Sequence, residues 1–486
     1  MLLCGVVFVI VSACTNGLVV GLGDQDIHEV FVHAAAGSDT FDADLLSSGG
    51  SSHPSLVFWV LAAARGLFSA DIVGFVGVLG LLFATGVAVG LLARAMAPTQ
   101  SAAWVLASAC AAPSQLVLGG APTVDPLLLP RLVALPLELW AVSLVIQRRW
   151  GLALGLTSFA LVVHAPSASA LLVAALISYG VVGPRRMGPL VLVALGLLPA
   201  LWILDWGAMG PVSLSDDAWR LVEARLAHHL VPTSWTAGLW VAAGAWALGA
   251  LTLTGRLSGR SQVRALLLGL FVWGLIAGTA GALLRAKILL NLEPWQGARL
   301  IALIAVTAAS CVALHMPRRV RLVSALALFG SCVALASPRW KVGEADWDIS
   351  TLGAWAQSNT EVGALFVVPP DLTPGFRVAA QRPIYGQWKD GGEVQFDPAL
   401  GLRWASRMRS LCACAPFVDL PAESSPFHRS QQLRRELGAS YDNRATEDLL
   451  ALARTAGASW LVRRDRGDRS EGAEVVGPYL VIPVDR

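Results

Sequence analysis

The segment RRWGLALGLTSFALVVHAPSASALLVAALISYGVVGPRR, residues 148–186, contains two apolar runs that meet at His164 and are bounded at each end by a pair of arginines. Arginine and lysine concentrate in the cytoplasmic connections of membrane proteins. If both arginine pairs stay in the cytoplasm, the chain must cross the membrane, turn near His164 and cross back. This segment therefore predicts a membrane hairpin with His164 at its outer tip.

The same alternation of basic and non-basic connectors extends over the first two thirds of the chain. Basic residues occupy every second connector between apolar runs, and these five connectors contain no Asp or Glu. Their arginines are Arg94, Arg148, Arg149, Arg185, Arg186, Arg256, Arg260, Arg264, Arg318, Arg319 and Arg321. The connectors between them hold acids, most of the histidines and the longest polar segments. This is the positive-inside pattern of a helical protein with many spans, so we expect its chemistry on the outer side.

The composition excludes a soluble globular protein and argues against a nucleic-acid partner. Of 486 residues, 55% are hydrophobic and only 14% are charged, and a soluble surface could not accommodate this ratio. The chain has 36 Lys and Arg, and without the 11 connector arginines the remaining 25 face 33 Asp and Glu. Thus no exposed basic stripe remains that could follow a phosphate backbone.

Eleven apolar runs are long enough, or nearly so, to cross a bilayer, for which a helix needs about 20 residues. They are Met1–Leu22, Asp71–Ala93, Ser101–Leu118, Leu127–Gln147, Gly151–His164, Ala168–Val182, Pro189–Leu204, Thr236–Thr254, Ala265–Leu284, Arg299–Leu314 and Leu322–Ser337. With the arginine connectors inside, the amino terminus is cytoplasmic and the carboxyl terminus is outside. We predict an α-helical polytopic membrane protein with about 11 transmembrane helices in residues 1–337.

Two apolar segments have alternative interpretations. Pro54–Phe68 is apolar enough to lie on the outer interface without crossing the membrane. The first span contains Val11-Ser12-Ala13-Cys14, which resembles a lipoprotein cleavage site. However, it lacks the basic residues that precede the apolar core of a signal peptide. We therefore expect an uncleaved first helix.

Residues 338–486 are polar, with mixed charge and no further apolar span. Short apolar segments alternate with amphipathic ones, which is typical of a small α/β domain. The expected helices are Ser350–Gln357 and Thr446–Ala456, and the expected strands are Ala364–Val368, Phe376–Ala380, Trp460–Arg463 and Tyr479–Val484. Because the last span ends outside, we expect this domain to be extracytoplasmic.

Three outer loops are long enough to build a site, namely residues 23–53, 206–235 and 285–299. The first holds six acids and three histidines but no Lys or Arg. Carboxylates accept protons and bind hard divalent cations, although acids in an exposed loop are equally consistent with a solvated face. The candidates for the catalytic base are Asp24, Asp26 and Asp44. If a divalent cation (Mg or Mn) binds, its expected ligands are Asp24, Asp26, Glu29 and His28.

The third outer loop, RAKILLNLEPWQGAR, is basic, with three cations against Glu293. Basic residues outside run against the positive-inside rule, so they suggest an anionic ligand such as a lipid phosphate. The substrate-binding candidates are Arg131, Arg285, Lys287, Arg299, His164, His228 and His229. Arg131 and Glu138 lie seven residues apart in the fourth span, on one helical face. Functional and structural interpretations of this pair remain equally open.

Several stretches of this chain resemble the GT-C superfamily of integral-membrane glycosyltransferases and, more closely, a poorly characterised bacterial multi-span group related to it. They are GDQDIHEVF (23–31), DTFDADLL (39–46), PRLVALPLEL (130–139), His164-Ala165-Pro166 at the hairpin tip, EPWQGAR (293–299) and FRVAAQRPIYGQWKDGG (376–392). The resemblance implies sugar transfer from a polyprenyl-phosphate carrier to a hydroxyl of a glycan, lipid or protein. It also implies a place in the bacterial cytoplasmic membrane, with an acid of the first outer loop as the base.

On this basis we expect the donor phosphate to contact Arg131, Arg285 and Arg299, and Asp24 or Asp26 to take the acceptor proton. In the carboxyl-terminal domain, Trp388, Lys389 and Asp390 either face the sugar or are ordinary strand-end residues. Two other functions remain as alternatives. One is a transporter or flippase of a lipid-linked or anionic substrate, and the other is a non-catalytic scaffold of envelope assembly with the same fold.

Overall fold

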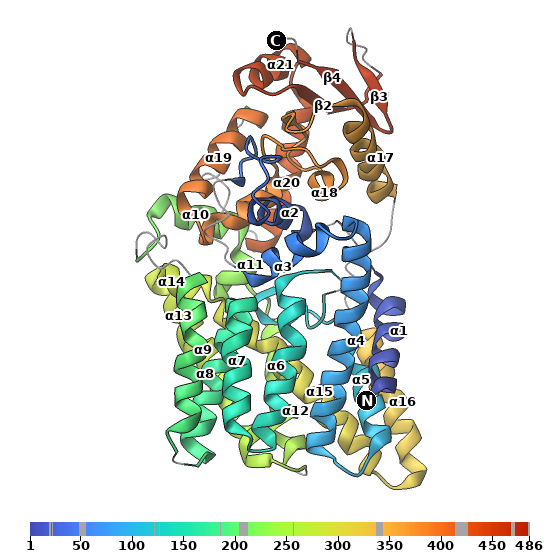
Figure 1. Cartoon of the computed structure of the whole chain (residues 1–486), viewed down its shortest axis with the longest axis vertical. Helices are drawn as coiled ribbons and strands as arrows, with labels where there is room; N and C mark the ends of the chain where they lie inside the picture. The colour runs from blue at the N-terminus through green and yellow to red at the C-terminus, as the bar shows by residue number, and fades with distance from the viewer. Residues whose placement is uncertain are drawn as a thin grey trace.

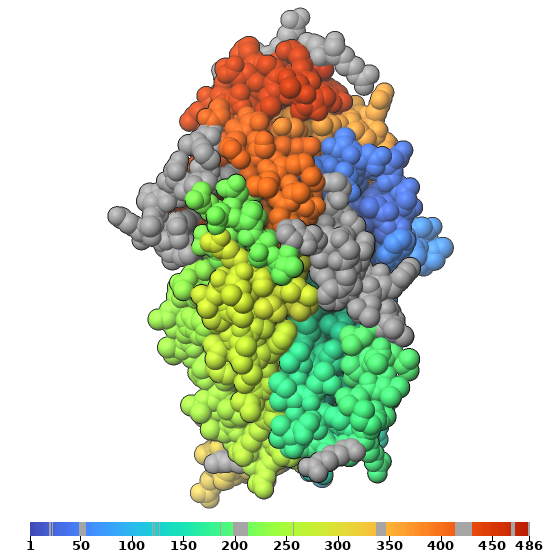
Figure 2. All heavy atoms as spheres, turned by 90° about the vertical axis from the view of Figure 1, so that its left-hand side faces the viewer, coloured from blue at the N-terminus to red at the C-terminus, as the bar shows by residue number. Residues whose placement is uncertain are grey.

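The computed structural model describes residues 1–18, 21, 23–47, 55–120, 122–125, 127–184, 186–203, 212–255, 257–336, 344–413, 426–467 and 472–484. The molecule is elongated, with a helical bundle at one end and the carboxyl-terminal domain stacked on the other (Figure 1). The first and second outer loops lie at the junction between these two parts (Figure 2).

Each of the eleven predicted spans overlaps one long helix of the bundle. These helices are α1 (Leu2–Asn16), α4 (Ala70–Met96), α5 (Ser101–Ala111), α6 (Pro130–Ile146), α7 (Trp150–Val163), α8 (Ala165–Val182), α9 (Gly188–Ile203), α12 (Ala237–Thr254), α13 (Arg260–Leu284), α15 (Gly297–His315) and α16 (Arg318–Ala334). Among the described residues, five helical segments are long and apolar enough to cross a membrane. The number of eleven crossings therefore remains a prediction.

Large apolar side chains cover the outside of the bundle, as a lipid-facing surface requires. Val241, Leu248, Leu283 and Leu322 each expose more than half of their surface, whereas soluble proteins rarely expose contiguous apolar patches of this kind. The chain is accordingly a membrane protein.

The basic connectors lie at the end of the bundle that is remote from the carboxyl-terminal domain (Figure 1). Successive helices run up and down, so the turns after α4, α6, α8, α12 and α15 gather at that end. Arg185 and Arg256 lie outside the described residues, and the other connector arginines flank these turns. The predicted separation of a basic end from a domain end is therefore present in the fold.

Short helices fill the junction between the bundle and the domain. They are α2 (Asp24–Ala35), α3 (Leu56–Arg65), α10 (Asp216–Arg225), α11 (Ala227–Leu230), α14 (Lys287–Asn291) and the 3-10 helices η2 (Leu118–Gly120), η4 (Pro232–Ser234) and η5 (Pro294–Gln296). The start of the first outer loop is thus helical. Helix α3 exposes Trp59 and Val60, which suits the interfacial position expected for Pro54–Phe68, although Pro54 lies outside the described residues.

The carboxyl-terminal domain combines helices with one small sheet. Its elements are α17 (Glu344–Asn359), β1 (Phe366–Val367), α18 (Phe376–Ala380), η6 (Trp388–Gln395), α19 (Pro398–Cys412), α20 (Pro426–Asn443), α21 (Thr446–Thr455), β2 (Trp460–Arg464), β3 (Glu474–Val476) and β4 (Tyr479–Pro483). The strand order is β1-β2-β4-β3, and only β1 and β2 pair in parallel. The predicted boundary at residue 338 falls outside the described residues.

Both helices and three of the four strands predicted for this domain are confirmed, but Phe376–Ala380 is a helix and not a strand. Phe376, Arg377 and Ala380 are all buried, and their spacing places them on one face of a helical turn. The helix starts after Gly375, whose φ of 149° is a conformation that favours glycine. Helix α18 carries Arg377, which pairs with Asp26 and Asp44 of the first outer loop.

Candidate functional site

A cavity of about 140 Å³ lies where the bundle meets the carboxyl-terminal domain. This is room for several water molecules, or for the polar part of a ligand that enters the cavity. Its charged and imidazole side chains are Asp24, His28, Arg131, His164, Arg225, His228, His229, Glu293, Lys389 and Glu393. Five of the residues singled out as catalytic or substrate-binding candidates from the sequence, namely Asp24, Arg131, His164, His228 and His229, therefore converge on one cavity.

Asp24, in the first turn of α2, is the predicted catalytic acid that faces this cavity. Its carboxylate lies 3.2 Å from Nη2 of Arg131 and forms an ion pair with Lys389, and 28% of the side chain is exposed. Burial raises the pKa of Asp24, but the charges of Lys389 and Arg131 outweigh this effect and hold the pKa well below its ordinary value. Asp24 is therefore a carboxylate at any physiological pH.

The two cations beside Asp24 come from different parts of the protein. Arg131 is in the first turn of α6, after Pro130, and its Nε also donates to Asp125 at 2.5 Å. Lys389 is in η6 of the carboxyl-terminal domain. The site is therefore complete only when this domain is docked on the bundle.

Arg225, the last residue of α10, is a third cation at the cavity, and the sequence interpretation missed it. Its side chain is only 8% exposed, its Nε donates to the Trp388 carbonyl at 3.1 Å, and its guanidinium lies 5.4 Å from the Trp388 ring centroid. Burial lowers the pKa of Arg225 to about 10. Within the described part of the chain, no carboxylate lies within ion-pair distance of it. The charges of Asp24, Asp390 and Glu393 act on Arg225 without outweighing the effect of burial, and a buried cation that lacks a direct ion pair attracts an anion.

The histidines of the cavity come from three separate segments. His228 and His229 are neighbours in α11, with ring centroids 3.9 Å apart, while His28 is in α2 and His164 caps α8. Across the described residues, no three His, Cys, Asp or Glu side chains are placed to hold a metal ion. The four proposed Mg or Mn ligands diverge, because Asp26 turns to Arg377 and Glu29 pairs with Arg65.

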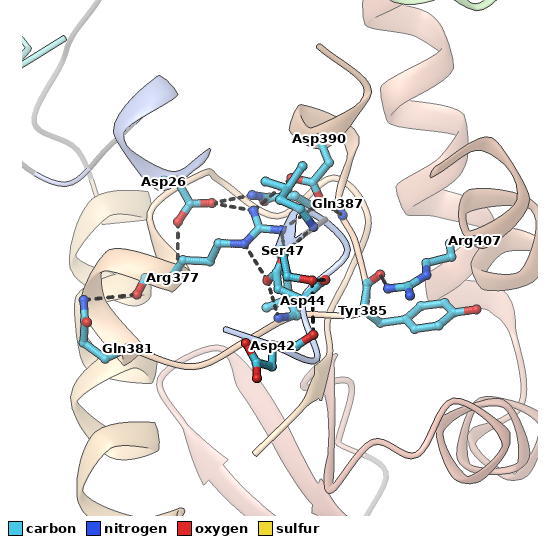
Figure 3. A network of polar contacts seen from close by, with 12 residues as sticks. Asp26, Asp42, Asp44, Ser47, Arg377, Gln381, Tyr385, Gln387, Asp390 and Arg407 are labelled. Carbon is cyan, nitrogen blue, oxygen red and sulfur yellow. Dashed lines mark hydrogen bonds and ion pairs between the residues drawn. The ribbon is translucent and has the colours of Figure 1, made fainter. Parts of the chain in front are cut away.

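The other two predicted catalytic acids, Asp26 and Asp44, belong to a buried ion cluster (Figure 3). Arg377 is its centre and donates to Asp44 at 2.8 and 2.9 Å and to Asp390 at 2.8 and 3.0 Å. Its Nη1 also lies 3.4 Å from Asp26, which accepts the Arg377 backbone N–H at 2.8 Å. Burial raises the pKa of Asp26 to about 6. These acids fix the carboxyl-terminal domain to the first outer loop, and neither lines the cavity.

The cations of the third outer loop do not gather at one place. Arg299 is 1% exposed and pairs with Glu138 at 2.7 Å, so Glu138 does not pair with Arg131. Arg285 pairs with Asp216 and lies over the Trp219 ring, away from the cavity. Lys287 is buried and does not line the cavity either. Of Trp388, Lys389 and Asp390, only Lys389 faces the cavity.

One family model matches part of the chain. A model described as a domain of unknown function (DUF6798) matches residues 347–411, which include Arg377, Lys389 and Asp390. No curated protein matches the chain.

Three solved structures are similar over nearly the whole chain. The oligosaccharyltransferase AglB from Archaeoglobus fulgidus, in complex with an inhibitory peptide and a dolichol-phosphate, is 11% identical with a TM-score of 0.45, over 95% of this chain and 69% of its own. The arabinofuranosyltransferase AftD from Mycobacteria is 16% identical with a TM-score of 0.47, over 96% of this chain and 35% of its own. An Archaeoglobus fulgidus oligosaccharyltransferase in complex with zinc and sulfate is 13% identical with a TM-score of 0.43. This similarity covers 95% of this chain and 68% of that structure.

These neighbours are GT-C glycosyltransferases, the superfamily that the sequence resembles. The chain spans only about a third of AftD. Since all three TM-scores lie below 0.5, we base the functional proposal on the geometry of the cavity.

Proposed function

We propose that this protein is a membrane glycosyltransferase that transfers a sugar from a polyprenyl-phosphate carrier to an acceptor hydroxyl. One observation carries the proposal: a single cavity holds the Asp24 carboxylate beside Arg131, Lys389 and the buried Arg225. Sugar transfer from a lipid phosphate needs both a proton acceptor and fixed positive charge for the leaving phosphate. The cavity supplies both at the end of a membrane bundle, where the headgroup of a lipid carrier would lie.

In the proposed reaction, the donor phosphate binds to Arg225 and Lys389. The acceptor oxygen bonds to the anomeric carbon from the face opposite the phosphate, which inverts the centre. The bond from that carbon to the phosphate oxygen breaks, and the phosphate keeps the electron pair. Asp24 takes the proton of the acceptor hydroxyl. Buried cations stabilise the departing phosphate without the reorganisation that water would require.

Because Asp24 forms ion pairs in the free protein, binding of the donor phosphate would also change the pKa of Asp24. In the free protein, Lys389 and Arg131 keep the pKa of Asp24 low, which makes it a weak base. A phosphate bound to Arg225 and Lys389 would compete with Asp24 for Lys389 and place its own negative charge nearby. Both changes raise the pKa of Asp24 and improve it as a proton acceptor. Donor binding thus prepares the base.

The direction of the arginine connectors supports a site on the extracytoplasmic face of a bacterial cytoplasmic membrane. These arginines lie at the end of the bundle remote from the cavity (Figure 1), and the positive-inside rule assigns such an end to the cytoplasm. The amino terminus would then be cytoplasmic and the carboxyl-terminal domain extracytoplasmic.

The test is Asp24→Asn in a strain that lacks the natural protein, with the glycolipids and surface glycans profiled by mass spectrometry. The control is Asp39→Asn, which removes an exposed acid of the same loop that does not line the cavity. We expect the wild type and the control to restore a glycan product that the Asp24→Asn variant fails to restore. Full restoration by Asp24→Asn would instead support a non-catalytic scaffold. Movement of an unchanged lipid-linked substrate across the membrane would support a transporter.

A further inference from the structure

Arg131 lies between two carboxylates, Asp24, which lines the cavity, and Asp125, which does not. Its Nε donates to Asp125 Oδ2 at 2.5 Å, and its Nη2 donates to Asp125 Oδ1 at 3.2 Å. The same Nη2 also donates to Asp24 Oδ2 at 3.2 Å. Asp125 thus occupies one edge of the guanidinium with two hydrogen bonds, the arrangement that gives arginine–carboxylate pairs their strength and direction. Asp24 shares a single nitrogen.

The position of Asp125 is fixed by its surroundings. Its side chain is buried, and the preceding Val124 is fully buried. The backbone N–H of Thr123 donates to the Gln115 carbonyl at 2.8 Å, and the Thr123 hydroxyl accepts the Gln115 backbone N–H at 3.0 Å. Among the described residues, Asp125 pairs with no cation other than Arg131. A buried carboxylate of this kind depends on its one counter-charge and holds it in place.

Lys389, the second cation beside Asp24, has no such tie. Its side chain is 27% exposed, and in the described part of the chain its one ion pair is with Asp24. A flexible ammonium can turn from a carboxylate to a phosphate, whereas a guanidinium with two hydrogen bonds to a buried acid stays where it is. Of the two cations, Lys389 also lowers the pKa of Asp24 more than Arg131 does.

The charges of these groups balance in the free protein, since two carboxylates face two cations. When Lys389 turns to the donor phosphate, one negative charge is left without a partner. Arg131 is bound to Asp125 through two hydrogen bonds and to Asp24 through one, so most of this charge belongs to Asp24. Asp24 then has the electron density that a base needs.

We infer that Asp125 is a positioning residue that holds Arg131 beside Asp24 and keeps it from the donor phosphate, so that Asp24 stays oriented and basic once the donor is bound. The donor in this inference rests on the proposed function, but the hold of Asp125 on Arg131 does not. Arg131 is then a support of the base, and Arg225 and Lys389 are the cations that bind the phosphate.

The hold on Arg131 can be measured in the intact protein in lipid nanodiscs, with ¹⁵N-labelled arginine. The Nε–H of Arg131 donates to Asp125 and not to Asp24. Its signal, assigned as the one missing from Arg131→Lys, should therefore move in Asp125→Asn and move much less in Asp24→Asn. It should also stay in place when farnesyl phosphate is added to the wild type. A signal that Asp125→Asn leaves unchanged, or that farnesyl phosphate moves as far as this variant does, would overturn the inference.

Asp125→Asn should change donor binding and catalysis in opposite directions. The variant adds one positive charge beside the cavity, and Arg131 can pair fully with Asp24 or turn to the phosphate. In calorimetry we expect farnesyl phosphate to bind about three- to tenfold more tightly than to the wild type. The rate of glycan product formation at saturating donor should fall about ten- to a hundredfold, because the base is neutralised or displaced. Asp125→Glu keeps the charge and should return the affinity toward the wild-type value.

The matched control is Glu138→Gln, which also removes a buried acid from an arginine pair. Its partner Arg299 does not line the cavity, so this variant should not bind farnesyl phosphate more tightly. If Asp125 only stabilises the fold, Asp125→Asn should weaken both binding and turnover, and that result would contradict the inference. If the wild type neither binds farnesyl phosphate nor forms a product, the proposed function fails, and the arginine spectra alone decide whether Asp125 holds Arg131.

Discussion

Replacement of Arg377 by Met should separate the carboxyl-terminal domain from the bundle more effectively than any other single change in that domain. Arg377 is fully buried and contacts three carboxylates, two from the first outer loop and Asp390 from its own domain. Methionine has a similar length and no charge. The variant would therefore leave the apolar contacts in place and remove the counter-charge of Asp26, Asp44 and Asp390.

The size of the effect follows from the contacts. Five side-chain hydrogen bonds join Arg377 to the three acids, and charge-assisted bonds contribute about 1.5–3 kcal/mol each in isolation. Their sum overstates the loss, because acids left without a cation take up protons and become neutral. Removal of one partner from a buried ion pair costs about 3–5 kcal/mol. We expect this range for Arg377→Met at neutral pH.

The loss of stability in Arg377→Met should increase with pH. Burial raises the pKa of Asp26 and of Asp390 even beside Arg377, so without Arg377 folding should favour the protonated forms of these two acids more strongly. A group of this kind destabilises the folded state as pH rises through and above its unfolded pKa. Arg377→Met should therefore be more harmful at pH 8 than at pH 5.

The assay is hydrogen exchange of the described segments 344–413 and 426–467 in nanodiscs, followed by mass spectrometry at pH 5 and 8. Arg435→Met is the control, because Arg435 is exposed in α20 of the same domain. Arg377→Lys keeps the charge but not the planar fork and should have an intermediate effect. The reasoning is refuted if Arg377→Met exchanges like Arg435→Met, or if its extra exchange is greater at pH 5 than at pH 8.

Three further predictions concern the cavity and the ion pair between Arg299 and Glu138. Asp24→Asn should lower the rate of product formation about 10²–10⁴-fold, as loss of a general base does, without a change in thermal stability of more than about 1 kcal/mol. Arg225→Met and Lys389→Met should each weaken binding of a short-chain polyprenyl phosphate in calorimetry, and the affinity should fall with added salt less steeply than in the wild type. Glu138→Gln should lower the free energy of unfolding by about 3–5 kcal/mol, because it leaves Arg299 buried without a counter-charge. The double variant Glu138→Gln with Arg299→Met should recover part of that loss in a thermal melt, and failure to recover would show that the pair is not the cause.

The bundle could be predicted from the sequence because its determinants are local. Each apolar run and each connector arginine can be interpreted within about 40 residues, as in the hairpin around His164. The assembly of the helices then follows from short connections and alternating direction. In the carboxyl-terminal domain the same procedure found β2, β4 and α21 but assigned Phe376–Ala380 to a strand. A five-residue apolar segment is too short to distinguish the periodicity of a helix from that of a strand. Whether it forms a helix or a strand depends on the elements that pack against it.

The contents of the site depend on contacts that sequence spacing does not reveal. Arg299 and Arg225 are both arginines at the outer end of the bundle, yet Arg299 is neutralised by Glu138, which is 161 residues away. Arg225 has no such partner in the described part of the chain and therefore remains available to an anion. The position of Arg225 in the second outer loop could have marked it as a candidate from the sequence, because the positive-inside rule disfavours arginine in outer loops.

The choice between Asp24 and Asp26 shows how the domain and the site depend on one another. Residues two positions apart on a helix point to nearly opposite sides, so Asp24 faces the cavity while Asp26 faces Arg377, which is 351 residues further along the chain. The neighbours Lys389 and Asp390 divide in the same way, since Lys389 pairs with Asp24 and Asp390 with Arg377. One docking event therefore forms the ion cluster and brings Lys389 to Asp24. Loss of the cluster should remove a cation from the cavity as well, so Arg377→Met should impair the site even where the domain stays folded.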